Sequence, residues 1–549
     1  MKILKVLGLI ALLLAGIGAL AWSNRATVLG LIAQARLPHI APNREVVWQQ
    51  GPADPPPVRR RPNVIFILVD DMGFNDLTLN GGVAGGAVPT PNMDSIGRDG
   101  VVFENGYAGN ATCAPSRASL LTGRYATRFG FEFTPAPVAF QRLVGTESEP
   151  GTLVKPHFSK ELVKDTPPME AMAVPASEIT IGKLLQGQGY HTLHFGKWHL
   201  GATPGARPED RGFDESLGFM AGASLFLPVK DKSVVNSKQP WDPIDRFLWP
   251  NLPYMVQFNG SEMFAPKGYM TDYLTDEAVK AIRANRNRPF FMYFAPNAIH
   301  TPLQATREDY DALSQIKDHR LRVYGAMVRN LDRNVGRLLA TLREEGLDQD
   351  TLIIFTSDNG GAGYIGLDDI NRPYRGWKAT FYEGGIHTPF FMKWPGRLPA
   401  GSRYPYPVGH VDIFATVAGA AGAEAPKDRV IDGVDLAPYV TGTAKGRPHQ
   451  TLFWRSGQYK AVRDGDWKLQ SNEARSKVWL YDLAKDPTEK TDLAAREPER
   501  VKAILALLAQ QDAASVKPLW PSLLQGPIFI DHPSGRPQKP GEEYILWDN

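Results

Sequence analysis

The stretch that sets the fold is Val64-Ile65-Phe66-Ile67-Leu68-Val69-Asp70-Asp71, an apolar run that ends in two carboxylates. An unbroken apolar run of this length is typical of a strand buried on both faces of a sheet. Similar runs predict further strands at 191–195 (HTLHF), 290–294 (FFMYF) and 351–356 (TLIIFT). Residues 271–285 and 321–345 carry apolar side chains at helical spacing. Strands that alternate with helices predict an α/β core.

Polar side chains follow each of these predicted strands. In chain order, the groups just beyond the strands are Asp70, Asp71, Lys197, His199, His300, Asp358 and Asn359. In open α/β sheets, ligands bind at the carboxyl ends of the strands. The sequence therefore predicts one composite site at that edge of the sheet.

The acidic part of this set indicates a bound cation. Two adjacent carboxylates at a buried strand end repel each other and lose hydration, and a cation relieves both costs. A helix cap or a turn is the alternative role, and it explains one aspartate better than two. Asp70, Asp71, Asp358 and Asn359 offer only oxygen ligands, a set that suits Ca²⁺ or Mg²⁺ rather than zinc or copper.

The stretch Thr112-Cys113-Ala114-Pro115-Ser116-Arg117-Ala118-Ser119-Leu120-Leu121-Thr122-Gly123-Arg124 holds the only cysteine of the chain, so no intrachain disulfide can form. Pro115 suits the first turn of a helix and Gly123 suits its end. Cys113 is then expected just before a helix N-terminus, a position that favours an anion, with Arg117 one turn later. This arrangement indicates a nucleophile, and the alternative is a buried structural thiol.

The Cys-x-Pro-Ser-Arg and Leu-Thr-Gly-Arg elements of this stretch resemble the signature of the formylglycine-dependent sulfatases, which belong to the alkaline phosphatase superfamily. The string Gly-Lys-Trp-His-Leu-Gly at 196–201 also matches that family, and the resemblance extends over about residues 62–511. It implies an α/β fold, with a large mixed sheet flanked by helices and a smaller C-terminal α+β subdomain. We therefore expect a catalytic domain at 62–445, followed by 446–549 with a short antiparallel sheet, a helix and an extended tail.

The resemblance also implies site residues and cofactors. In this family the cysteine at the position of Cys113 is oxidised by a maturation enzyme to formylglycine, an aldehyde whose hydrate attacks sulfur. The metal ligands would be Asp70, Asp71, the modified Cys113, Asp358 and Asn359, with calcium most often bound and magnesium as the alternative. The residues that match the family's catalytic positions are Cys113, Arg117, Lys197, His199, His300 and Lys378.

The expected reaction is hydrolysis of an aryl or carbohydrate sulfate to an alcohol and inorganic sulfate, with His300 favoured as the general acid. Trp377 stands where many relatives have glycine, and His387 where arginine is frequent, which puts substrate details in doubt. Two rival functions remain open. One is a phosphonate monoester or phosphodiester hydrolase with the same signature, and the other is a sulfated-glycan binding protein that has lost catalysis. Residues 225–260 are either a substrate-selecting insertion or ordinary loop packing.

The N-terminus reads as an export signal. Lys2 and Lys5 precede an apolar run, so residues 1–22 are expected to be a cleaved signal or a retained membrane anchor, and 23–61 a linker. The protein is then periplasmic or extracellular. The net charge of +3 and the lack of a basic run interleaved with aromatic residues argue against a nucleic-acid partner.

Overall fold

The computed structural model describes residues 38–55, 61–148 and 152–549. The expected export signal and most of the expected linker lie outside these residues. None of the described helices is long and apolar enough to span a membrane.

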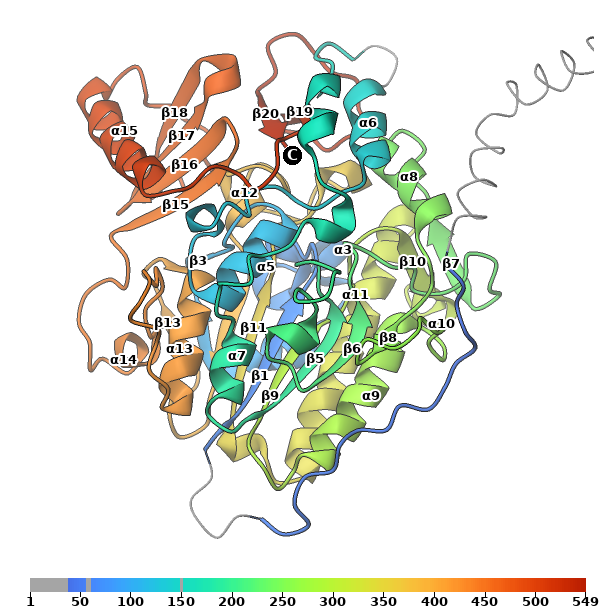
Figure 1. Cartoon of the computed structure of the whole chain (residues 1–549). Coiled ribbons are helices and arrows are strands. Elements are labelled where there is room, and N and C mark those ends of the chain that lie inside the picture. Colours follow the sequence, from blue (N-terminus) through green and yellow to red (C-terminus); the bar gives the residue numbers. More distant parts are fainter. Residues whose placement is uncertain (1–37, 56–60, 149–151) are drawn as a thin grey trace, which may run out of the picture.

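A mixed sheet of nine strands forms the centre of the molecule, in the order β13-β2-β12-β11-β1-β9-β5-β6-β8 (Figure 1). Strand β1 (Asn63–Val69) runs parallel to both of its neighbours, β11 (Thr351–Ser357) and β9 (Phe290–Ala295). Beyond β9, strand β5 (His191–Lys197) is also parallel. The outer strands are β6 (Glu215–Phe219), β8 (Gln257–Phe258), β12 (Phe390–Lys393), β2 (Val101–Phe103) and β13 (Ser402–Tyr404).

Helices cover both faces of this sheet, because alternate side chains of β1 enter two different cores. Ile65, Ile67 and Val69 pack into one hydrophobic cluster, and the side chains between them pack into the other. The first core is closed by α4 (Pro91–Arg98), α9 (Met270–Ala284) and α11 (His319–Glu344), and the second by α5 (Cys113–Thr122), α7 (Ile181–Gln186) and α13 (Val411–Ala421). The predicted α/β fold with a large mixed sheet is confirmed.

The C-terminal region carries a separate antiparallel sheet of four strands, coloured orange in Figure 1. Its strands are β15 (Thr451–Ser456), β16 (Tyr459–Asp464), β17 (Trp467–Asn472) and β18 (Lys477–Asp482), and α15 (Pro498–Ala513) packs against it. Alternating apolar residues at 459–463, 467–469 and 478–481 predict three short strands, and residues 498–511 an amphipathic helix. These four elements are present, whereas the pattern does not predict β15. The domain boundary at residue 446 stays a prediction.

Two segments expected to be irregular contain regular structure. The tail forms β19 (Leu524–Phe529) and β20 (Tyr544–Asp548), which share a sheet with β4 (His157–Phe158). The stretch 225–260 contains β7 (Val234–Ser237), which pairs with β10 (Leu303–Thr306), and α8 (Pro243–Asn251). Phe226 and Val256 of this stretch belong to the main core, so part of it has a packing role.

Candidate active site

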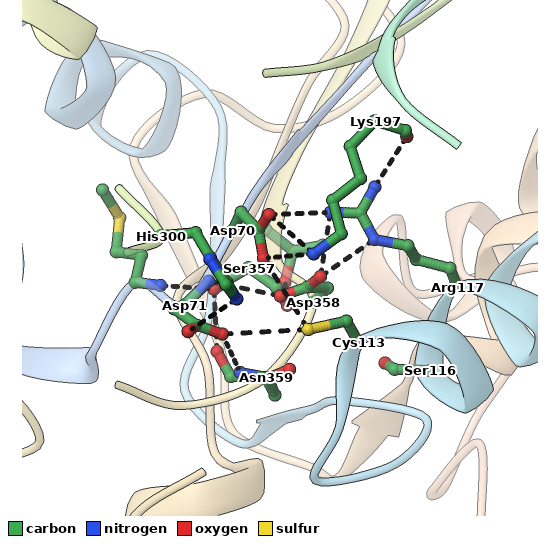
Figure 2. A network of polar contacts seen from close by, with 12 residues as sticks. Asp70, Asp71, Cys113, Ser116, Arg117, Lys197, His300, Ser357, Asp358 and Asn359 are labelled. Atoms are coloured by element: carbon green, nitrogen blue, oxygen red, sulfur yellow. Dashed lines mark hydrogen bonds and ion pairs between the residues drawn. The ribbon is translucent and has the colours of Figure 1, made fainter. Parts of the chain in front are cut away.

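The parallel pairing of β1 with β11 brings the acidic residues together. Val69 lies opposite Ser357 in the register, so Asp70 and Asp71 leave β1 beside Asp358 and Asn359. The backbone N–H of Asp358 donates to the carbonyl of Val69 at 3.0 Å. All four side chains are buried, as the sequence pattern predicted for groups at the strand ends (Figure 2).

Asp71 is the most heavily contacted of these carboxylates. It accepts hydrogen bonds from Asn359 Nδ2 at 2.8 Å and from Tyr364 Oη at 3.2 Å, and Lys378 Nζ lies 2.7 Å from its Oδ1. His300 Nε2 lies 3.6 Å from its Oδ2. Burial alone would raise the pKa of Asp71, but Lys378, His300 and a more distant lysine hold it well below the ordinary value.

Two further cations neutralise the remaining carboxylates. Lys197 Nζ donates to both oxygens of Asp70, at 2.8 and 3.0 Å. Arg117 donates through Nε to Asp358 Oδ2 at 2.9 Å, and its Nη1 donates to the backbone carbonyl of Lys197 at 2.9 Å. Arg117, Lys197 and both carboxylates are completely buried, so each charge depends on its partner for compensation.

Cys113 points into this network from the start of α5 (Figure 2). The helix begins at Cys113 itself, with Thr112 as its N-cap. Cys113 is therefore the first residue of the helix, whereas the sequence pattern placed it just before the helix. The thiol Sγ lies 3.8 Å from Asp70 Oδ1 and 4.0 Å from Asp71 Oδ1. Burial alone would raise the pKa of Cys113, but the ammonium groups of Lys197 and Lys378 lower it to about 7.

The two histidines differ in surroundings. Burial would lower the pKa of His300, but the nearby Asp71 carboxylate raises it, and its Nδ1 lies 2.6 Å from the carbonyl of Thr301. Burial and the charge of Lys197 hold the pKa of His199 well below its ordinary value. His199 contacts the carbonyl of Pro135 through Nε2 at 3.4 Å, and its Nδ1 has no hydrogen-bond partner among the described residues.

The spacing of Lys197 and His199 predicts that both side chains project to one side of an extended backbone, but the backbone at His199 is not extended. Lys197 is the last residue of β5, but His199 has φ of +63°, so the chain turns immediately after the strand. Trp198 packs into the core on the α5 side of the sheet and donates through Nε1 to the carbonyl of Ala206. The structure therefore brings Lys197 onto Asp70, while the hydrogen bond of His199 within the described residues goes to the carbonyl of Pro135 instead of to a carboxylate.

The side chains present fit a hard cation. Asp70, Asp71, Cys113 and His300 each offer one ligand atom, and these atoms lie within 4.8 Å of one another. Asn359 Oδ1 is buried and has no hydrogen-bond partner within the described part of the chain, although its amide nitrogen is bonded to Asp71. An unpartnered buried carbonyl oxygen beside two carboxylates is a natural ligand for Ca²⁺ or Mg²⁺. Asp358 instead directs one oxygen at Arg117.

Sequence analysis missed Tyr364, which donates to Asp71 from the short 3₁₀ helix η8 (Gly363–Ile365). No motif marks this tyrosine. The two departures from the family pattern lie nearby but outside the acidic network. His387 stacks on Tyr374 and contacts Glu383 through Nδ1 at 2.8 Å, and Trp377 is buried against Gly363.

Comparisons with known proteins place this fold and site in one class. The profile of the sulfatase family matches residues 62–423, and the profile described as N-sulphoglucosamine sulphohydrolase, C-terminal, matches residues 375–514. The relatives are enzymes that hydrolyse sulfuric esters, and the chain is an enzyme of that class. The chain belongs to the sulfatase family, within the alkaline phosphatase superfamily, as its sequence motifs indicated.

Several relatives cover most of the chain. N-acetylgalactosamine-6-sulfatase of Mus musculus is 33% identical over 416 residues, which are 74% of this chain and 71% of the relative. Steryl-sulfatase of Homo sapiens is 28% identical and covers 83% of this chain and 87% of its own length. Among solved structures, Ps i-CgsB in complex with k-i-k-neocarrahexaose has a TM-score of 0.69 at 30% identity, covering 84% of this chain and 95% of that one. Phosphonate monoester hydrolase SpPMH from Silicibacter pomeroyi shares the fold, with a TM-score of 0.58 at 20% identity, over 83% of this chain and 96% of that one.

Proposed function

We propose that this sulfatase hydrolyses the sulfate monoester of a carbohydrate, with an aryl sulfate as the alternative substrate. It would use a formylglycine made from Cys113 and one divalent cation, Ca²⁺ in preference to Mg²⁺. One observation carries the proposal. A single thiol, its pKa lowered to about 7, points at two carboxylates and lies within the charge field of two lysines. Such a cluster suits a nucleophile that attacks an anionic ester.

The cation would be held by Asp70, Asp71, Asp358, Asn359 and the modified Cys113. When bound, it would supply positive charge to the sulfate oxygens and favour ionisation of the group that attacks sulfur. The structure adds His300 as a neighbour of this set, because its Nε2 lies within reach of Asp71.

The remaining cations would bind and orient the sulfate. Lys197 pairs with Asp70, and Lys378 pairs with Asp71. Either ammonium group can donate a hydrogen bond to a sulfate oxygen. Arg117 would hold Asp358 and the end of β5 in position rather than contact substrate, since its hydrogen bonds go to Asp358, to the backbone of Lys197 and to Tyr293.

His300 would protonate the leaving oxygen. Burial would lower its pKa, but the Asp71 carboxylate raises it and so favours the protonated imidazole, which is the form that a general acid needs. His199 would bind as a neutral imidazole, because burial and Lys197 disfavour its charged form. Its unpartnered Nδ1 is then available to a polar group of the substrate.

The carbohydrate preference rests on the relatives. One is named for the sulfate of N-acetylgalactosamine, and the solved structure at 30% identity holds a neocarrahexaose. The relative named steryl-sulfatase is named for a sulfate ester without sugar, which is the reason to retain a non-carbohydrate substrate as the alternative. We also propose that the protein is exported to the periplasm or outside the cell through residues 1–22, either as a cleaved signal or as a membrane anchor.

Parallel kinetics on para-nitrophenyl sulfate and on a para-nitrophenyl phosphonate monoester test the reaction. We expect a higher kcat/KM with the sulfate ester and loss of turnover in Cys113→Ala. Mass spectrometry of the Cys113 peptide, with hydrazide labelling, tests the modification. Faster turnover of the phosphonate would make the chain a phosphonate hydrolase, sulfate binding without turnover would make it a binding protein, and an intact thiol in fully active enzyme would overturn the formylglycine.

A further inference from the structure

One cavity lies close to the acidic site, across the turn that carries Tyr364, and has no role in the proposed chemistry. It measures about 450 Å³, a volume within the range of small-molecule sites. Segments far apart in sequence meet there, namely the loop after β1, the stretch before α8, the start of α11 and the C-terminal tail. The lining residues that matter are Trp241, Asp318, Arg320, Asp368, Asp369 and Arg536.

A single turn separates this cavity from the acidic site. Tyr364, in η8, donates its hydroxyl to Asp71, while its backbone carbonyl accepts a hydrogen bond from Trp241 Nε1 at 3.3 Å. The same turn holds the tail, because Ser534 N donates to the carbonyl of Gly363 at 3.0 Å. The acidic site and this cavity therefore lie on two sides of the same turn.

Both arginines that line the cavity already have partners. Arg320 donates to the carbonyl of Gly366 at 2.8 Å, and its guanidinium carbon lies 4.4 Å from the centre of the Trp241 ring. Arg536 forms an ion pair with Asp368. Arg536 is thus paired with a carboxylate, whereas Arg320 is held in place by a backbone carbonyl and an indole ring.

Four aspartates and two arginines line the cavity, so carboxylates outnumber cations there. Asp369 is exposed and pairs only with Arg372, an exposed partner at 2.8 Å, and Asp318 caps α11 through one oxygen. Carboxylate oxygens accept hydrogen bonds from sugar hydroxyls but repel sulfate and carboxylate groups. The lining thus favours a neutral, hydroxyl-rich ligand over an anion.

We propose that this cavity is a second subsite, which binds an uncharged sugar unit next to the sulfated unit. This inference rests on the proposed sulfatase function. The substrate would then be an oligosaccharide in which an unsulfated sugar unit adjoins the sulfated one. The C-terminal tail and Trp241 would contribute to substrate selection.

Filling the cavity from its rim provides the test. Ser534 is exposed and lines the cavity, so Ser534→Trp adds bulk there without disturbing the core. Thr443→Trp, at an exposed position after α14 (Ala437–Val440), is the matched control. Saturation-transfer NMR measures binding of three uncharged probes: desulfated neocarrahexaose, cellotetraose and N-acetylchitotetraose. We expect wild type and Thr443→Trp to bind at least one probe, and Ser534→Trp to bind it about tenfold more weakly.

Turnover of para-nitrophenyl sulfate tests the sulfatase function separately from the sugar subsite, because this substrate is too short to enter the cavity. We expect both tryptophan variants to retain it. Absence of turnover in wild type would count against the sulfatase proposal, while the NMR result would still decide on the cavity. Failure of all three probes, or binding that Ser534→Trp leaves unchanged, would overturn the subsite.

Discussion

Replacing Lys468 by methionine tests how the C-terminal sheet is joined to the catalytic part. Lys468 projects from β17 and is completely buried, with Nζ 2.7 Å from Glu383 Oε1 and 3.0 Å from Glu489 Oε1. Burial would raise the pKa of Glu383, but Lys468 and His387 hold it well below its ordinary value, so this carboxylate stays charged. Removing one partner of a buried ion pair costs about 3–5 kcal/mol, because the other charge is left without compensation. We expect Lys468→Met to lose stability by that amount.

Equilibrium unfolding in urea at neutral pH measures the loss. Lys477→Met is the control, since Lys477 on β18 pairs with Glu543 at a partly exposed position and should cost less than about 1 kcal/mol. The double variant Lys468→Met/Glu489→Gln should recover part of the loss, because it removes one of the two stranded carboxylates. A Lys468→Met protein as stable as the Lys477→Met control would refute the argument that Lys468 compensates these carboxylates.

Three further outcomes are expected. Asp358→Asn should lower the calcium or magnesium content found by elemental analysis and abolish turnover, and zinc in the wild type would contradict the ligand set. Tyr459→Phe removes the hydroxyl that accepts a hydrogen bond from the N–H of Phe381 at 2.9 Å, three residues from Lys378. The kcat for an aryl sulfate should therefore fall, while the far-ultraviolet circular dichroism spectrum stays that of the folded protein. An unchanged kcat would show that this hydrogen bond does not position Lys378. Burial raises the pKa of Asp76 from 3.8 to about 8, so its contribution to stability is complete below the lower value and is lost as pH rises through the upper one. Unfolding of Asp76→Asn should therefore depend less on pH across that window than wild type, and equal slopes would contradict the shift.

The strand ends were predictable because two physical signals coincide there. Continuous apolar runs marked β1 and β11 as strands buried on both faces, and adjacent carboxylates marked where they end. Parallel strands end at the same edge, so Asp70 and Asp358 had to meet. Tyr364 could not be found in this way, because its hydroxyl reaches Asp71 only through the course of the turn at η8.

The strands that were not predicted lack a regular alternation of apolar and polar residues. In β15, Leu452 and Trp454 pack toward the catalytic part while Phe453 packs toward α15, so apolar residues on both faces hide the alternation. In β19, Pro527 argues against a strand, yet the segment pairs with β20 in register with Leu546. At His199 the backbone adopts a left-handed conformation that the neighbouring residues do not predict.

The burial of α5 bears on when the chain acquires its nucleophile. All ten residues of this helix are buried, Cys113 included, and Arg117 is held by Asp358 and the end of β5. A maturation enzyme that reads Cys113 together with Pro115 and Arg117 would find none of them at the surface of the finished fold. If the proposed formylglycine forms, its conversion from Cys113 would therefore have to precede folding, during or soon after synthesis. Protein made without that enzyme would stay inactive when the enzyme is added later, unless the chain is first unfolded.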